Sequence, residues 1–433
     1  MSGAYRMTYL DKIQGPGCGC EAYDQGKKLV SIDQAFQAIN QTVSAVKEEE
    51  ILPLAKAHGR VLSQPVLARG MTPPFDNSAM DGYAVRAADF QGEGPWHMPV
   101  VGRITAGSTL DPEIALQGAA VRIFTGAPVP ASCDAVIMQE AVEREGDTIT
   151  LRSRPTPGSH IRKAGEDMRT GAEILPVGTL LGAREIAACA AAGQGEVSVT
   201  RKIRVAFVSS GDELKQPGTD LTGSEIWDAN LPMIQASLPE LAQLDIKVSG
   251  ARDDEGSLEA KLSDYLAQAD LVITTGGISV GEADLVKPTM QALGVAEIFS
   301  GVAIKPGKPV SLGRLDQAVW LGLPGNPLSA YVTWTLFGRD LLARLSGQST
   351  VKSKRRHVVL AEEVQHRPGR CELRPVRLSG FDGQGREIAS TERATHSARL
   401  SGISEAEGLI FIPGDCEMIA AGGLAEFLPF DEY

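Results

Sequence analysis

The sequence has no apolar run long enough to cross a membrane and no surplus of positive charge. A membrane-spanning helix needs about 20 consecutive apolar residues, and none of the 433 residues lies in such a run. The formal net charge is −12, whereas nucleic-acid-binding proteins usually carry a basic surface. We therefore expect neither a membrane nor a nucleic acid among the partners of this protein.

The sequence also lacks an ordered set of cysteines. The six cysteines are scattered, apart from Cys18 and Cys20, which does not suit a disulfide framework. A zinc site would need a second Cys or His pair at ligand spacing, and no Ser-His-Asp or Cys-His catalytic set is recognisable either. The first residues contain no apolar signal core, so we expect a cytoplasmic protein.

Changes of pattern along the chain predict a multidomain α/β and β protein. Ser31 and Gln34 form a possible capping box that opens a helix. Strands and helices alternate from residue 203, which favours a central three-layer α/β domain with a mostly parallel sheet. The expected parts are an N-terminal extension (1–30), a helical and strand linker domain (31–70 plus 170–202), an inserted small β domain (71–169), the α/β domain (203–351) and a C-terminal β domain (352–433).

Within the α/β domain, loops with polar residues follow the predicted strands. We expect strands at 203–210, 245–251, 270–275 and 318–323, and a helix over 229–243 with a kink near Pro239. Ligands bind outside the carboxyl ends of the strands in such sheets. The loops after these strands should therefore lie at one rim and surround one cleft.

The segment "ITTGGISVGEAD" (273–284) is the most unusual of these loops. Gly276 and Gly277 allow close approach of the backbone to a ligand, and Thr274, Thr275 and Ser279 supply hydroxyl donors. The segment lacks the lysine of a Walker loop, and the acids that follow can coexist with phosphate if a divalent cation such as Mg²⁺ bridges them. A tight strand–helix turn without a ligand is the alternative.

Positive charge and further acids occur elsewhere in the chain. Lys305 and Lys308 flank a Pro-Gly turn in "AIKPGKPVSL" and could project from one rigid loop; the alternative is two ordinary surface lysines. Asp81 lies in "PPFDNSAMDGYAV", where a simple turn is equally compatible with the sequence. The acidic turn "GED", which contains Asp167, carries less information because such turns are common.

Taken together, these motifs resemble the molybdopterin molybdenumtransferase family. The matching segments run in family order from about residue 31 to the C-terminus. They are "FDNSAMDGYAVRAAD", "VRIFTGAPVP", "GEDMRTGAEILPVGTLL", "VAFVSSGDEL", "TTGGISVGEAD", "AIKPGKPVSLG" and "LGLPGNPLSAYVT".

The resemblance implies an enzyme that inserts molybdenum from molybdate into adenylylated molybdopterin and releases AMP. It also implies a requirement for Mg²⁺ and a homodimer. The active cleft would lie between the central domain of one subunit and the inserted β domain of the other. The resemblance thereby explains how "FDNSAMDGYAV" could meet "TTGG".

Matched motif by motif, the resemblance also implies the site residues. The catalytic set would be Asp81, Thr125, Asp167, Glu213, Asp253, Asp284 and Lys305. Of these, the Mg²⁺ ligands would be Glu213, Asp253 and Asp284. The substrate-binding set would be Thr274, Thr275, Gly276, Gly277, Ser279, Lys308, Pro324, Gly325, Asn326, Pro327, Ser329 and Ser397.

Two positions depart from the family pattern, and two other functions compete with metal insertion. Gly301 stands where relatives often carry a lysine, and Pro375 stands where they often carry an arginine. One alternative is the adenylyltransferase of the same pathway, whose single domain resembles 203–346. The other is a scaffold without activity. The two extra β domains oppose the first alternative, and the retained acids oppose the second.

Overall fold

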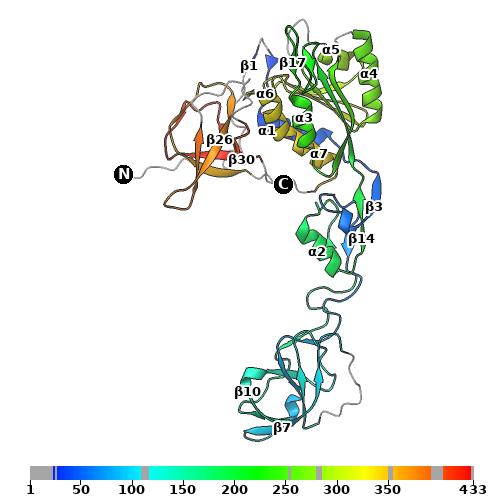
Figure 1. The fold of residues 1–433 in the computed structure, drawn as a ribbon, viewed down its shortest axis with the longest axis vertical. Coiled ribbons are helices and arrows are strands. Elements are labelled where there is room, and N and C mark those ends of the chain that lie inside the picture. The colour runs from blue at the N-terminus through cyan, green and yellow to red at the C-terminus, as the bar shows by residue number, and fades with distance from the viewer. Residues whose placement is uncertain are drawn as a thin grey trace.

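The protein is elongated, with its β insertion at the end opposite to the α/β domain (Figure 1). The computed structural model describes residues 23–24, 27–108, 117–251, 255–278, 285–349, 355–391 and 403–430. The C-terminal β domain lies beside the α/β domain, and a narrow linker joins the α/β domain to the insertion. Within the described ranges, no helix is both long and apolar enough to span a membrane.

A six-stranded sheet forms the centre of the α/β domain, in the order β18-β15-β19-β23-β22-β20. The first four strands are parallel, and the last two run antiparallel to their neighbours. The sheet is therefore mixed. Its strands are β15 (Ile203–Ser210), β18 (Ala242–Ala251), β19 (Leu271–Thr275), β20 (Ala296–Ser300), β22 (Ser311–Leu315) and β23 (Ala318–Leu323).

Helices cover both faces of this sheet because strand residues alternate between two apolar cores. Val205 and Phe207 face one core, which includes Ile39 and Phe337, whereas Val208 faces a second core. Pro327 stands in the first turn of its helix, where its missing N–H is not needed. The helices are α1 (Ile32–Thr42), α3 (Asn230–Ala236), α4 (Glu255–Gln268), α5 (Val286–Ala292), α6 (Pro327–Thr333) and α7 (Arg339–Leu345).

The predicted start of the first helix is confirmed, whereas the helix expected over 229–243 is much shorter. The Gln34 amide donates to Ser31 Oγ at 3.1 Å, and the Ser31 amide donates to Gln34 Oε1 at 2.9 Å. The second prediction is wrong because α3 ends at Ala236 and β18 already begins at Ala242. Pro239 lies between them, where its ring opposes continuation of the helix.

The inserted segment contains a six-stranded sheet in the order β10-β11-β7-β8-β6-β9. Its apolar residues form two small cores of their own. A two-stranded pair, β5 with β12, joins the segment around residue 77 to that around residue 161. The strands are β5 (Asn77–Ser78), β6 (Gly82–Val85), β7 (Trp96–Ile104), β8 (Ala120–Ile123), β9 (Ala135–Met138), β10 (Val142–Glu145), β11 (Thr148–Leu151) and β12 (Ile161–Arg162).

The C-terminal domain is a small closed barrel. Its strands pair in the order β26-β27-β24-β30-β28, and β28 returns to β26. A short strand of the α/β domain, β21 (Ile304–Lys305), pairs with the first two residues of β26, before the part of β26 that pairs with β27. The domain's strands are β24 (Arg356–Leu360), β25 (Val364–Gln365), β26 (Cys371–Phe381), β27 (Glu387–Thr391), β28 (Gly408–Ile412), β29 (Met418–Ile419) and β30 (Leu424–Pro429).

The linker is built from two short antiparallel pairs and one helix. β3 (Glu49–Pro53) pairs with β14 (Glu196–Thr200), and β4 (Val66–Leu67) pairs with β13 (Glu173–Leu175). α2 (Ala183–Ala191) contributes Cys189 to the small core between them. The chain thus leaves and re-enters the α/β domain side by side.

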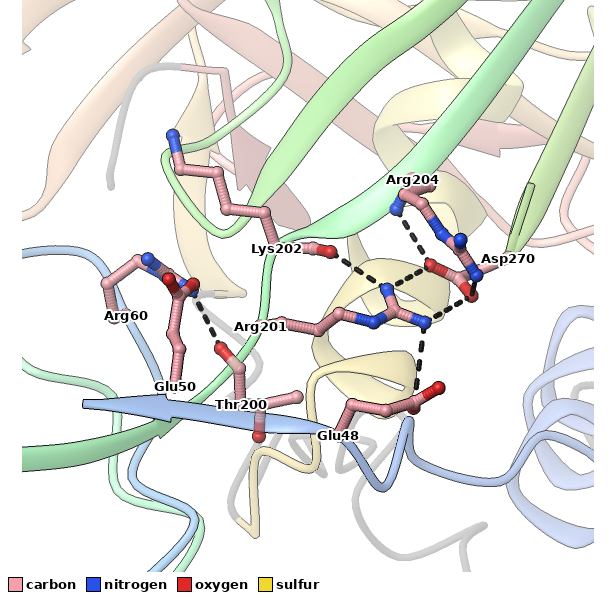
Figure 2. Close-up of polar contacts among 8 residues, drawn as sticks. All are labelled: Glu48, Glu50, Arg60, Thr200, Arg201, Lys202, Arg204 and Asp270. Carbon is pink, nitrogen blue, oxygen red and sulfur yellow. Dashed lines mark hydrogen bonds and ion pairs between the residues drawn. The ribbon is translucent and has the colours of Figure 1, made fainter. Parts of the chain in front are cut away.

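Ion pairs hold the junction between the linker and the α/β domain (Figure 2). Arg201 binds Asp270 through two nitrogens, at 2.6 and 2.9 Å, and the Arg204 amide donates to the same carboxylate at 2.8 Å. Glu48 lies 3.6 Å from Arg201. On the linker side, Arg60 donates to the Thr200 carbonyl at 2.7 Å. These ion pairs and hydrogen bonds therefore fix β3 and β14, the two strands that connect the linker to the α/β domain, to the central sheet.

We predict that Asp270→Asn destabilises this junction. Burial alone would raise the pKa of Asp270, but hydrogen bonds from Arg201 and Arg204 outweigh burial and lower the pKa below its usual 3.8. The substitution should cost about 2–3 kcal/mol of unfolding free energy, less than a fully buried pair because the arginines are partly exposed. Denaturant unfolding at pH 7 measures this loss.

The pH dependence supplies a second readout for Asp270→Asn. A carboxyl group with a lowered folded-state pKa stabilises the protein above its unfolded-state pKa, and the contribution disappears as the pH falls through the folded-state pKa. The difference in unfolding free energy between wild type and Asp270→Asn should therefore become smaller below about pH 4. Glu240→Gln, which removes only the exposed Lys202–Glu240 pair, should change stability little. Equal losses in both variants would contradict the prediction.

Candidate active site

The carboxyl ends of β15, β19 and β23 meet at one rim of the central sheet. β15 lies between β18 and β19, so the chain leaves β15 toward one side and returns to its other side for β19. Such a reversal of strand order is a topological switch point, where open α/β sheets bind their ligands. The loops after β15 and β19 therefore flank the crevice in which we expect a ligand.

Glycines allow the loops at this rim to pack backbone against backbone. Gly276 has φ +83°, and a Cβ there would lie 2.7 Å from the Ser210 carbonyl oxygen. Gly277 has φ +63°, and its Cβ would lie 2.6 Å from Val286 Cγ2. A Cβ on Gly325 would lie 3.4 Å from the Gly276 Cα. The close approach expected for Gly276 and Gly277 is thus made to the protein itself.

The hydroxyls of the "TTGG" segment point into the domain. Thr274 Oγ1 accepts a hydrogen bond from the Trp320 indole at 3.0 Å, and Thr275 Oγ1 lies 3.0 Å from Ser209 Oγ. Both threonines are fully buried. The Gly276 amide donates to the Leu323 carbonyl at 3.3 Å. The two threonine hydroxyls and the Gly276 amide thus form hydrogen bonds within the domain, and these packed groups shape the rim.

Glu213 lies at the end of β15 with its carboxylate folded over Gly211. A Cβ on Gly211, which has φ +145°, would lie 2.7 Å from Glu213 Oε2. The side chain is exposed, and among the described residues it makes no hydrogen bond or ion pair. A carboxylate in this position is a suitable oxygen donor for a hard divalent cation.

The "LPGNP" turn (323–327) ends β23 and begins α6. Asn326 accepts the first helical hydrogen bond, and Pro327 occupies the first turn. The Gly325 carbonyl accepts a hydrogen bond from Asn230 Nδ2 at 2.9 Å, and Asn230 is 5% exposed. We did not expect Asn230 at the rim. The feature that could have indicated it lies nearby in the sequence. Asp228, two residues earlier, accepts hydrogen bonds from the Asn230 and Leu231 amides at the start of α3.

The predicted lysine loop lies against α6 and the C-terminal barrel. A Cβ on Gly307, between Lys305 and Lys308, would lie 2.4 Å from Thr333 Cγ2. The Lys305 side chain is 53% exposed and its Nζ lies 3.7 Å from Glu372 Oε2. Ser329, which the resemblance places in the substrate-binding set, is buried in α6.

The two departures from the family pattern have structural explanations. Gly301 has φ +90°, and a Cβ there would lie 2.7 Å from Leu29 Cδ2, so a lysine would not fit without a shift. Arg374 does not supply a cation in place of Pro375, because its guanidinium binds the buried Glu372. Arg377 pairs with Glu405. Lys305 is a cation that this region presents to solvent, since its side chain is 53% exposed.

A second polar group lies on the inserted domain around Asp81. Thr125 donates to Asp81 Oδ1 through its amide at 2.8 Å and through its hydroxyl at 2.9 Å. The hydrogen bond from the Thr125 amide does most to lower the pKa of Asp81, and the bond from the Thr125 hydroxyl comes next. The nearby charge of Arg122 lowers this pKa further. Asp81 is exposed and ionised at neutral pH, so it can accept a hydrogen bond from a ligand. Asp167 is also exposed, and its amide donates to the Thr72 carbonyl at 3.0 Å.

An arginine pair beside Asp81 was not expected from the sequence. Arg103 and Arg122 are neighbours across β7 and β8. Their guanidinium carbons lie 4.7 and 5.0 Å from the centre of the Phe124 ring. The pair arises because neighbouring strands bring together residues distant in sequence, and no local motif reveals it.

The two polar groups lie far apart in one chain. The group around Asp81 belongs to the inserted domain, and Lys305 and Glu213 belong to the α/β domain at the opposite end of the molecule (Figure 1). The expected site residues Asp253, Ser279, Asp284 and Ser397 lie outside the described residues. Within the described part of the chain, no group of three His, Cys, Asp or Glu side chains could hold a metal ion.

Comparison with known proteins matches the chain over nearly all of its length. A MoeA N-terminal region (domain I and II) matches residues 30–193, a probable molybdopterin binding domain matches 206–344, and a MoeA C-terminal region (domain IV) matches 357–430.

Curated relatives and solved structures agree with these matches. The molybdopterin molybdenumtransferase of Haemophilus influenzae is 38% identical over 325 residues, which cover 75% of this chain and 80% of that protein. Molybdopterin molybdenumtransferase 2 of Mycobacterium tuberculosis is 36% identical over 387 residues, 86% of this chain and 92% of that protein. The crystal structure of a molybdopterin biosynthesis protein, moeA, from Pyrococcus horikoshii has a TM-score of 0.79 at 27% identity, covering 93% of this chain and 100% of that one.

We predict that Gly276→Ala destabilises the rim more than Gly294→Ala does. Both glycines have positive φ, but a Cβ at Gly294 would meet nothing nearer than Leu315 Cδ1 at 3.9 Å. Gly294→Ala should therefore cost about 1 kcal/mol for its backbone conformation, and Gly276→Ala a further ~1–3 kcal/mol for the clash with Ser210. Thermal unfolding of both variants measures the difference. Equal unfolding midpoints in the two variants would contradict the prediction, because they would show that the rim accommodates the added methyl group.

Proposed function

Because the chain belongs to the molybdopterin molybdenumtransferase family, we propose that it transfers molybdenum from molybdate to adenylylated molybdopterin and releases AMP. Membership makes the protein a transferase of molybdenum-cofactor biosynthesis. The observation that carries the finer proposal is the rim of the α/β domain. There the crevice at the switch point adjoins an exposed carboxylate, Glu213, while the exposed ammonium of Lys305 lies in a loop packed against α6.

The α/β domain would bind both the pterin and the oxyanion. Gly276 and Gly325 pack backbone against backbone and place no side chain at this rim, where we expect the pterin to bind. The Lys305 ammonium would donate charge-assisted hydrogen bonds to the molybdate dianion. Lys308, on the same turn, would add positive charge to this side of the crevice.

The residues present are compatible with Mg²⁺. Glu213 supplies an exposed carboxylate without a side-chain partner in the described part of the chain, and we propose Asp253 and Asp284 as the further ligands on the family pattern. When bound, the ion would neutralise negative charge on the diphosphate link of the substrate. The role of Glu213 itself is to place an oxygen donor at the end of β15.

We also propose that the protein is a homodimer and that Asp81 and Thr125 reach the crevice of the partner subunit. One chain holds its two polar groups at opposite ends (Figure 1), so a single chain does not complete the site. Large apolar side chains are exposed along the linker, which supports a buried contact there. They are Ile51, Leu67, Met71, Val177 and Leu180.

The proposed reaction is tested by measuring AMP release from adenylylated molybdopterin. Release should require molybdate, stop when a chelator removes divalent cations, and resume when Mg²⁺ is restored. Consumption of ATP with molybdopterin, without molybdate-dependent AMP release, would instead indicate the adenylyltransferase of the pathway. A protein inactive in both assays would contradict the proposal.

Glu213→Gln tests the proposed metal ligand, and Asp212→Asn is its matched control. Both substitutions remove one exposed negative charge from the same loop. Glu213→Gln should raise the Mg²⁺ concentration for half-maximal AMP release about tenfold, since an amide is a weaker ligand than a carboxylate. Asp212→Asn should leave that concentration within about twofold of the wild-type value. The same change in both variants would contradict the role of Glu213 as a metal ligand, because it would show that any negative charge in this loop has the same effect.

A further inference from the structure

A buried carboxylate of the C-terminal barrel lies directly behind Lys305. Glu372, in β26, is 3% exposed. Its Oε1 accepts from Arg374 Nε at 3.0 Å and Nη2 at 2.8 Å, and its Oε2 lies 3.7 Å from Lys305 Nζ and 3.9 Å from His366 Nε2. Burial of a charged carboxylate is costly unless such partners compensate it.

The partners of Glu372 differ in their freedom to move. Arg374 is buried and also donates to the Gln365 carbonyl at 3.2 Å. The His366 ring lies between two backbone carbonyls, with Nδ1 2.6 Å from the Cys416 oxygen and Nε2 3.2 Å from the Arg370 oxygen. Lys305, in contrast, is half exposed. The Glu372 carboxylate is therefore held in one position, and the Lys305 ammonium is the group that can move toward a ligand.

Backbone pairing places Lys305 and Glu372 side by side. β21 and β26 run parallel with Ile304 opposite Cys371 and Lys305 opposite Glu372. The Cys371 amide donates to the Ala303 carbonyl at 2.9 Å, and Arg370 Nη1 donates to the Ile304 carbonyl at 3.2 Å. The position of a lysine of the α/β domain is thus set by a strand of the C-terminal barrel.

We propose that Glu372 is a positioning residue that orients the Lys305 ammonium for the oxyanion substrate, an inference that rests on the function proposed above. The separation of 3.7 Å exceeds a direct hydrogen bond, so Glu372 attracts the ammonium without occupying its N–H groups. Arg374 offsets the charge of Glu372, which limits repulsion of a dianion. Orientation before binding lowers the entropy that a flexible lysine loses when it contacts a ligand.

This chain lacks two cations that relatives often carry in this region. Gly301 and Pro375 remove positive charge from the region, and Lys305 then has to contact the oxyanion from a better-defined position. A purely structural role, in which Glu372 only joins the barrel to the α/β domain, makes a different prediction. It affects unfolding but leaves the kinetics of the folded enzyme unchanged.

Glu372→Gln separates the two roles, with Glu426→Gln as the matched control. Glu426 forms a partly buried pair with Arg355 at 3.2 Å in the same barrel. Glu372→Gln should raise the KM for molybdate about tenfold, with the KM for adenylylated molybdopterin unchanged, and Glu372→Asp should restore part of the loss. Glu426→Gln should leave both KM values unchanged. Wild-type KM values in Glu372→Gln, with or without a lowered unfolding midpoint, would overturn the proposal.

A double-substitution cycle tests whether Glu372 acts through Lys305. Molybdate binding is measured by calorimetry for wild type, Lys305→Met, Glu372→Gln and the double variant. In the Lys305→Met background, Glu372→Gln should weaken binding no further. An equal loss in both backgrounds would overturn the proposal. A wild type that binds molybdate but releases no AMP would contradict only the proposed reaction, because the four affinities could still be compared.

Discussion

The register of three parallel strands is the constraint on which the candidate site depends. β15, β19 and β23 pair so that Ser209 lies opposite Thr275, and Thr275 opposite Leu323. The loops after these strands therefore begin level with one another at the same edge of the sheet, and Gly276 can contact both the Ser210 carbonyl and Gly325. A shift of one strand by one residue would exchange the side chains that face the two apolar cores and would separate these loops. The crevice follows from this register.

Local patterns predicted much of the fold and less of the site. The capping box at Ser31 and the strand at 203–210 could be recognised because each depends on neighbouring residues. The sequence did not reveal that the hydroxyl of Thr274 would be used by Trp320, because that contact joins residues 46 positions apart. Glu372 was missed for the same reason. A side chain's residue type indicates what it can bind, whereas only the fold decides which partner it meets.

Charge joins the parts of this acidic protein at two interfaces. Asp270 holds Arg201 where the linker meets the α/β domain (Figure 2), and Glu372 attracts Lys305 where the barrel meets it. Both carboxylates sit among more than one cation, so neither is an isolated buried charge. The second interface also determines the surroundings of Lys305. An element that stabilises the domain contact thus also contributes to the proposed oxyanion site.

The central claim is that the active site combines Lys305 of one chain with Asp81 of another. A heterodimer of Asp81→Asn and Lys305→Met chains, purified through two different tags, tests it most directly. Each variant alone should be inactive in molybdate-dependent AMP release. The heterodimer contains one site with both residues intact, so it should show about half the wild-type activity. A heterodimer no more active than either variant alone would contradict a site shared between subunits.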